Sequence, residues 1–194
     1  MTELFKPGAG VIFMKVGTHA NEDLEAIIQR KQKEIDEEGF ALWGYGGNTC
    51  HPTTMVQPFA EEHAEAGSPI ILCMEPMNSK HFAEPIRANE YSADGLSWSA
   101  VPPGINAVGS RFALCIKSLD PVDFELPLAA TEVAVGRCAG RLGSQYVRGR
   151  VDKACLNIRD VEAISNDPSL DKRPKIGLTA ELCAPWAVFL RSTE

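Results

Sequence analysis

Short apolar runs and longer polar stretches alternate along the chain, and their spacing distinguishes strands from helices. One strand is predicted at 11–16 (VIFMKV), because this run is short, apolar and rich in residues that favour strands. Another is predicted at 69–76 (PIILCMEP), whose apolar run is typical of a strand buried on both faces. The same pattern predicts further strands at 40–45, 111–119, 130–136, 145–156 and 178–190, the last of them bent at Pro185. Residues 77–107 contain turn-forming residues throughout and predict a long, less regular excursion with short pieces of structure.

Apolar residues recur at helical spacing in the first half of the chain. A helix is predicted from Glu22 to Glu38, with Asn21 as its N-terminal cap and Gly39 as its C-terminal stop. A second helix is predicted from Thr53 to Ala66, with Pro58 in its first turn or at a kink. The first helix has an apolar stripe of Leu24, Ile27, Ile28 and Ile35. Its opposite face is expected to be solvent-exposed and carries Glu25, Gln29, Arg30, Lys33, Glu34 and Glu37.

The order of these elements predicts the fold class. A strand, a helix and a strand followed by several β segments favour an α+β fold with two main helices near the N-terminal half. Its sheet is expected to be mixed and largely antiparallel, and could curl into a partly closed barrel. At 194 residues, with 44% hydrophobic and 23% charged residues, the chain has the size and composition of a single globular domain over residues 1–194.

The apolar runs and the cysteines indicate where in the cell the protein is expected. No apolar run reaches the roughly 20 residues of a membrane helix, so no membrane partner is expected. The N-terminal residues lack the basic and apolar regions of a secretory signal. Six cysteines are spread along the chain without a CxxC pair, which is typical of reduced cysteines and predicts a cytoplasmic protein.

Charge is distributed unevenly. Residues 1–90 hold 14 acidic and 7 basic side chains, which accounts for the net charge of −7, and residues 91–194 hold 12 of each. Binding to long duplex nucleic acid requires many Lys and Arg contacts to phosphates, and an acidic chain argues against it. A local basic patch in such a chain favours a small anionic partner.

A glycine turn with polar side chains follows the strand at 40–45. Glycines let the backbone approach a ligand closely, and the free N–H groups of the next helix would face an anion. The spacing fits neither a P-loop nor a dinucleotide loop, and a strand-to-helix turn with capping threonines is the alternative. The candidate ligand-binding residues in this turn are Gly46, Gly47, Asn48, Thr49, His51, Thr53 and Thr54.

A second candidate is the arginine-rich segment 136–150, which contains no acidic residue. If 145–156 is a strand, Tyr146, Arg148 and Arg150 share one face, where a ring can stack on a base and guanidinium groups can bind a phosphate. The alternative is a solvated hairpin whose arginines pair with the acidic first half of the chain.

The sequence gives weaker signals for a catalytic site or a metal site than for an anion-binding site. Cys50 next to His51 could be a nucleophile near a helix N-terminus, with His19 or His81 as a remote base. Glu75 is a charged residue within an apolar strand and a further catalytic candidate. The histidines, among them His63 between glutamates on a predicted exposed helix face, lack the paired spacing of a zinc site, so no metal and no other cofactor is predicted.

These clusters predict a protein that binds a small anionic ligand, a nucleotide or modified base, between the Gly46–Thr54 turn and the Tyr146, Arg148, Arg150 face. An alternative is a hydrolase or transferase acting on a nucleotide-like substrate with Cys50 or His51 in the chemistry. A second alternative is an interaction module or inhibitor that uses the acidic helix 22–38. The pattern specifies neither catalytic activity nor oligomeric state.

Overall fold

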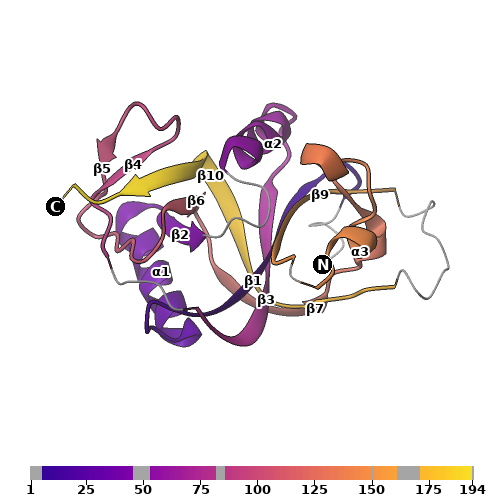
Figure 1. The fold of residues 1–194 in the computed structure, drawn as a ribbon, viewed down its shortest axis with the longest axis horizontal. Coiled ribbons are helices and arrows are strands. Elements are labelled where there is room, and N and C mark those ends of the chain that lie inside the picture. Colours follow the sequence, from indigo (N-terminus) through magenta and orange to yellow (C-terminus); the bar gives the residue numbers. More distant parts are fainter. Residues whose placement is uncertain (1–5, 46–52, 82–85, 150, 161–170, 194) are drawn as a thin grey trace. The chain divides into compact units, whose positions relative to one another are not determined.

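The computed structural model describes residues 6–45, 53–81, 86–149, 151–160 and 171–193 (Figure 1). The helices are α1 (Leu24–Glu38), α2 (Thr53–Glu65) and the short α3 (Gly143–Tyr146), with 3₁₀ turns at Leu128–Ala130 and Gly136–Cys138. The strands are β1 (Gly10–His19), β2 (Ala41–Tyr45), β3 (Ile70–His81), β4 (Glu90–Ser92), β5 (Ser99–Ala100), β6 (Phe112–Ile116), β7 (Asp120–Glu125), β8 (Thr131–Val133), β9 (Lys153–Ile158) and β10 (Lys175–Arg191).

The chain forms two compact units, and each is assembled from three separate stretches of sequence. The first unit contains Met1–Lys15, Asn48–Pro76 and Pro121–Thr179, and the second contains Val16–Gly47, Met77–Asp120 and Ala180–Glu194. The long strands β1, β3 and β10 each contribute residues to both units. The expectation of a single domain over 1–194 stays a prediction.

In the first unit, β3, β1, β9 and β8 are hydrogen-bonded neighbours in that order, and β7 pairs with β10. Strands β1 and β9 are antiparallel, with Val11 opposite Leu156 and Phe13 opposite Ala154. These four residues are fully buried in one apolar core, because alternate residues of a strand point to the same face. The core also contains Ile71, Cys73, Leu126, Leu128, Val133, Val147, Ile158 and Ile176.

In the second unit, β6 lies between β2 and β10, and β10 also pairs with β4. The β2–β6 pair is antiparallel, with Leu42 opposite Cys115. Both residues are buried in a core with Ile105, Ala113 and Val188. The short β4–β5 hairpin lies within the excursion at 77–107, where short pieces of structure were expected.

Capping residues fix the ends of α1. Oδ1 of Asp23 accepts a hydrogen bond from the N–H of Ala26 at 2.9 Å, so Asp23, and not Asn21, is the N-terminal cap. Gly39 has a φ of 81° and closes the helix, as predicted, because glycine adopts the left-handed conformation without steric cost. Pro58 lies inside α2, five residues after its first residue.

The predicted fold class is confirmed. The structure combines a mixed sheet, antiparallel in its recorded registers, with two main helices in the N-terminal half. The path of paired strands runs from β2 to β8 and does not close into a barrel within the described ranges. No helix in those ranges has the length and apolar content needed to cross a membrane.

Candidate anion-binding site

Most of the predicted glycine turn lies outside the described residues. This applies to Gly46, Gly47, Asn48, Thr49, Cys50 and His51, and also to Arg150 in the second candidate segment. Thr53 is the first residue of α2, and Thr54 beside it is exposed. The expectation that this turn meets the arginine segment therefore stays a prediction.

The predicted strand at 145–156 is wrong over its first half. Residues Gly143–Tyr146 form α3, and β9 begins only at Lys153, so Tyr146 and Arg148 do not alternate along a strand. Gly143, the first residue of α3, packs so closely on Thr131 that an added Cβ would lie 2.0 Å from the threonine Oγ1. The N–H of Val147 then donates to the carbonyl of Gly143 at 2.8 Å.

Tyr146 and Arg148 therefore have different environments. Tyr146 is half-buried and packs against the core of the first unit. Arg148 is exposed, and its Nε donates to the carbonyl oxygen of Ser144 at 3.1 Å. The structure therefore does not place this aromatic ring and this guanidinium group on one face of a strand.

Two charged residues extend the apolar face of neighbouring strands in the first unit. On β1, Lys15 follows core residues Val11 and Phe13 at a spacing of two. On β3, Glu75 follows Ile71 and Cys73 at the same spacing. Lys15 and Glu75 are both half-buried at the end of this face, and β1 and β3 are adjacent strands.

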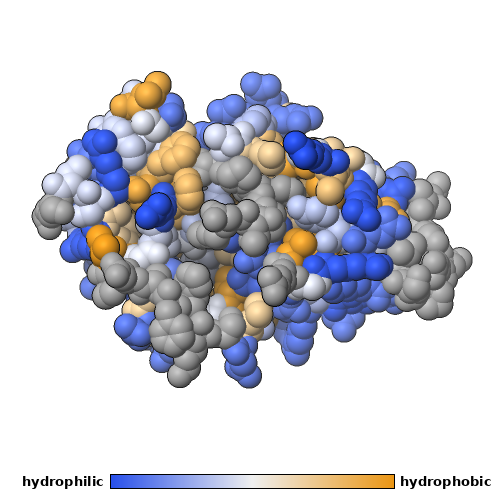
Figure 2. All heavy atoms as spheres, viewed as in Figure 1, coloured by the Kyte–Doolittle hydropathy of each residue, from blue (hydrophilic) through white to orange (hydrophobic). Residues whose placement is uncertain are grey.

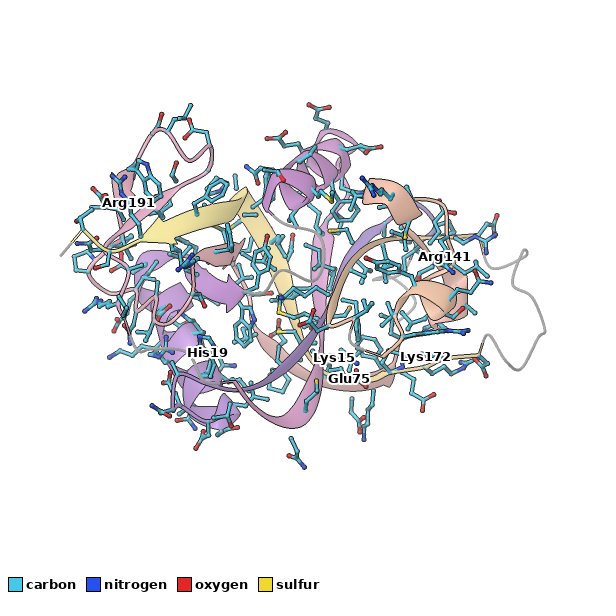
Figure 3. The ribbon with its side chains drawn as sticks, in the orientation of Figure 1. Lys15, His19, Glu75, Arg141, Lys172 and Arg191 are labelled. Carbon is cyan, nitrogen blue, oxygen red and sulfur yellow. The ribbon has the colours of Figure 1, made fainter. Side chains whose placement is uncertain are left out.

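Lys172 approaches the same region from the segment before β10. Its Nζ donates to the carbonyl oxygen of Val147 at 2.6 Å, and its own carbonyl accepts from the N–H of Leu128 at 3.0 Å. The N–H of Lys15 donates to the carbonyl of Asp152 at 2.8 Å. The short segment from Val147 to Asp152 is thus bonded to Lys172 at one end and to Lys15 at the other. Figure 3 shows Lys15, Glu75 and Lys172 in one region of this unit.

The charges of Lys15, Glu75 and Arg148 act on the ammonium group of Lys172. Partial burial lowers the pKa of Lys172, and the charge of Lys15 lowers it further. The carboxylate of Glu75 raises this pKa, whereas the guanidinium of Arg148 lowers it. We call Lys15, Arg148, Lys172 and Glu75 the basic cluster: three cationic side chains and one carboxylate.

The hydrogen bonds recorded for the side chains of Lys172 and Arg148 go to backbone carbonyl oxygens. None of the three cations of the basic cluster forms a salt bridge within 4.0 Å with a carboxylate of the described residues. The surface where Figure 1 places α3 and β7 is largely hydrophilic (Figure 2). Partly buried cations attract an anion more strongly than fully solvated ones, because water screens them less.

The sequence predicted part of this cluster. Glu75 and Arg148 were candidates for different reasons, and the charges of both act on the pKa of Lys172. Lys15 was missed, although a lysine at a core-facing position of an apolar strand is a recognisable signal. Lys172 lies in a polar segment with no pattern of its own, and only the tertiary structure reveals it.

His19 was named as a remote base for Cys50, which lies outside the described residues, so the catalytic alternative stays a prediction. Nε2 of His19 lies 3.2 Å from the carbonyl oxygen of Val108 and 3.4 Å from Oγ of Ser110. Within the described part of the chain, no group of three histidine, cysteine or acidic side chains is arranged to hold a metal.

His63 is not exposed as predicted. It is 7% exposed, and its Nε2 lies 3.0 Å from Oδ1 of Asn157 on β9. The ring packs edge-on against Phe59 and covers Gly10, where an added Cβ would lie 2.7 Å from the ring. His63 therefore anchors α2 on the sheet of the first unit.

The acidic helix is less available for a partner than predicted. Glu34 is 2% exposed and bonded to Arg30 and Lys31, which contradicts its expected place on a solvated face. Glu22 pairs with Arg30, and Oε1 of Glu38 accepts from the N–H of Gly104 at 3.0 Å. These internal contacts hold α1 within the second unit.

Comparison of the chain with protein-family models, with curated proteins and with solved structures finds no match.

Proposed function

We propose that the protein binds a small anionic ligand, such as a nucleotide, at the basic cluster of the first unit. The observation that carries this proposal is that the charges of Lys15 and Arg148 both act on Lys172, while none of the three cations forms a salt bridge with a carboxylate of the described residues. Such groups repel one another, and a bound anion would remove this repulsion.

The chemistry of the three cations favours a phosphate group. Lysine ammonium groups act as point charges, and the planar guanidinium of arginine can bind two phosphate oxygens at once. Tyr146 packs against the core, so support for the proposal comes from charge and not from stacking on a base. We also propose a cytoplasmic location, which the free cysteines of the described residues support.

Calorimetric titration with nucleotides and inorganic phosphate would test this function. Charge-assisted hydrogen bonds contribute about 1.5–3 kcal/mol each, so we expect Lys172→Met to weaken binding by about tenfold or more. The matched control is Lys175→Met, which removes an exposed lysine from the same unit where Lys175 pairs with Asp123 at 3.2 Å. The control should bind like the wild type.

Two results would overturn the proposal. One is the absence of binding of any tested anion to the wild type at low ionic strength, where exposed charges are least screened. The other is equal affinity in the wild type and in a variant combining Lys15→Met, Arg148→Met and Lys172→Met. Thermal denaturation gives a second readout, because a ligand at 100 times its Kd stabilises the folded state by about 2.7 kcal/mol.

A further inference from the structure

We propose that Cys115 and Cys183 are a redox-modifiable pair, which a peroxide links as an intrachain disulfide between β6 and β10. Both cysteines lie in the second unit, and this inference does not rest on the proposed anion-binding function. Both are free thiols in the structure. The disulfide would join two strands that are already hydrogen-bonded neighbours, through residues 68 positions apart in the sequence.

The pairing of β6 with β10 brings the two cysteines to the same level of the sheet. Leu182 lies opposite Ile116, and the next residues along this antiparallel ladder are Cys183 and Cys115. At this step β10 bulges, and its recorded pairing with β6 resumes only at Ala187. Opposite residues of antiparallel strands have Cα atoms about 4.5–5.5 Å apart, which falls within the range of about 4.4–6.8 Å that a disulfide spans.

The two side chains also face the same core. Ala113 and Cys115 are buried in the core of the second unit, because alternate residues of β6 point to one face, and Cys183 packs against that core. Burial raises the pKa of the Cys115 thiol, and Cys183 raises it further. Strand register and shared core therefore identify one pair of thiols, and their electrostatic interaction supports it.

Cys183 is the thiol that a peroxide reaches first. It is half-buried and precedes the exposed Ala184 in the bulge of β10, whereas Cys115 is 0% exposed. Burial raises the pKa of Cys183, the ammonium group of Lys117 lowers it, and the carboxylate of Glu181 raises it. Because the thiolate is the reactive form and is scarce at neutral pH, the pair responds to sustained exposure to an oxidant.

The oxidation balances with one molecule of hydrogen peroxide. The thiolate of Cys183 attacks one peroxide oxygen and the O–O bond breaks, which gives a sulfenic acid on Cys183 and, after proton uptake, one water molecule. The sulfur of Cys115 then attacks the sulfur of Cys183 to form the S–S bond. The proton of Cys115 goes to the departing hydroxyl group, which leaves as a second water molecule. The two thiols lose two electrons in total, and the peroxide takes them up.

The other described cysteines differ in access or in placement. Cys73 and Cys155 are buried in β3 and β9 of the first unit. Cys138 is half-buried, but it lies in the 3₁₀ turn Gly136–Cys138 and not on a paired strand. Cys138 is therefore a matched control: it is partly accessible like Cys183, but no strand register sets a cysteine opposite it.

Peptide mass spectrometry of the 194-residue chain tests this inference. The reduced protein would be exposed to hydrogen peroxide, its remaining thiols alkylated, and its peptides mapped without reduction. We expect a linked peptide pair containing Cys115 and Cys183, which dithiothreitol separates and which is at least tenfold more abundant than any linkage of Cys138. Cys183→Ala should abolish this linkage, and Cys138→Ala should leave it unchanged.

Thermal denaturation gives a second readout, because a disulfide restricts the unfolded chain. We expect peroxide to raise the melting temperature of the wild type by roughly 5–10 °C and to leave that of Cys183→Ala unchanged. The inference is wrong if peroxide converts Cys183 to a sulfinic or sulfonic acid while Cys115 stays a free thiol. It is also wrong if disulfides form equally among all the cysteines, because strand register would then not direct the reaction.

Discussion

Nζ of Lys31 lies 2.7 Å from Oε2 of Glu34, and both side chains are less than 5% exposed on α1. The same lysine donates to the backbone carbonyl of Asn106 at 3.0 Å, and Glu34 also accepts from Arg30 and from the N–H of Asn106. This face of α1 has a composition typical of a solvated surface, but it is hydrogen-bonded to the segment around Asn106 in the second unit.

Removing the carboxylate of Glu34 should strongly destabilise the fold. Glu34→Ala leaves Lys31 buried without its charged partner, and breaking a buried ion pair in this way costs about 3–5 kcal/mol. The matched control is Glu37→Ala on the same helix, where Glu37 is exposed and lies 3.7 Å from Lys33. The control should cost less than about 1 kcal/mol in urea denaturation. Equal losses in the two variants would contradict this account of the pair.

Burial of Lys31 should make stability depend on alkaline pH. Its pKa is lowered by burial to about 8 from an ordinary 10.5, so between these values the unfolded chain binds more protons than the folded one. The free energy of unfolding should therefore rise with pH through this window, by up to about 1.4 kcal/mol per pH unit from this group. Denaturation of the wild type and of Lys31→Met from pH 7 to 10 would isolate the contribution, and parallel curves would refute it.

A methyl group at Gly10 should disturb the packing of α2. The added Cβ would lie 2.7 Å from the His63 ring, so Gly10→Ala forces the ring to shift and should cost about 1–3 kcal/mol. In a His63→Ala background the space is open, and the same change should cost much less. A double-mutant cycle measures the difference. An unchanged cost in both backgrounds would mean that the ring does not limit this position.

Neighbouring charges should set the pH at which the amine of Lys172 loses its proton and is labelled by a general amine reagent. The charges that act on it come from Lys15 on β1, Glu75 on β3 and Arg148 after α3. Glu75 raises the pKa of Lys172, so Glu75→Gln should shift the pH profile of its labelling downward. Lys15→Met and Arg148→Met should shift it upward, because both cations lower that pKa. Profiles that move together in one direction would contradict the arrangement of the basic cluster.

Local patterns predicted much of the secondary structure. The helix expected at Glu22 to Glu38 exists as α1, because its apolar stripe and Gly39 act over neighbouring residues. Apolar runs likewise identified β1, β2, β3 and β6, whose ends differ from the prediction by a few residues. By contrast, β7 (DPVDFE) was missed, since proline and aspartate suggest a turn when its pairing with β10 is unknown.

The sequence alone determined the α+β class, the two main helices and the candidacy of Glu75 and Arg148, because these depend on spacing along a short stretch of chain. Tertiary structure alone decided that Gly143–Tyr146 turns as a helix against Thr131, that Glu34 and His63 are buried, and that Lys15 and Lys172 belong to one cluster. Burial and electrostatic interactions depend on residues that are far apart in the sequence, such as Lys15 and Lys172, which are 157 positions apart. No local sequence pattern predicts an interaction between residues so far apart in the chain.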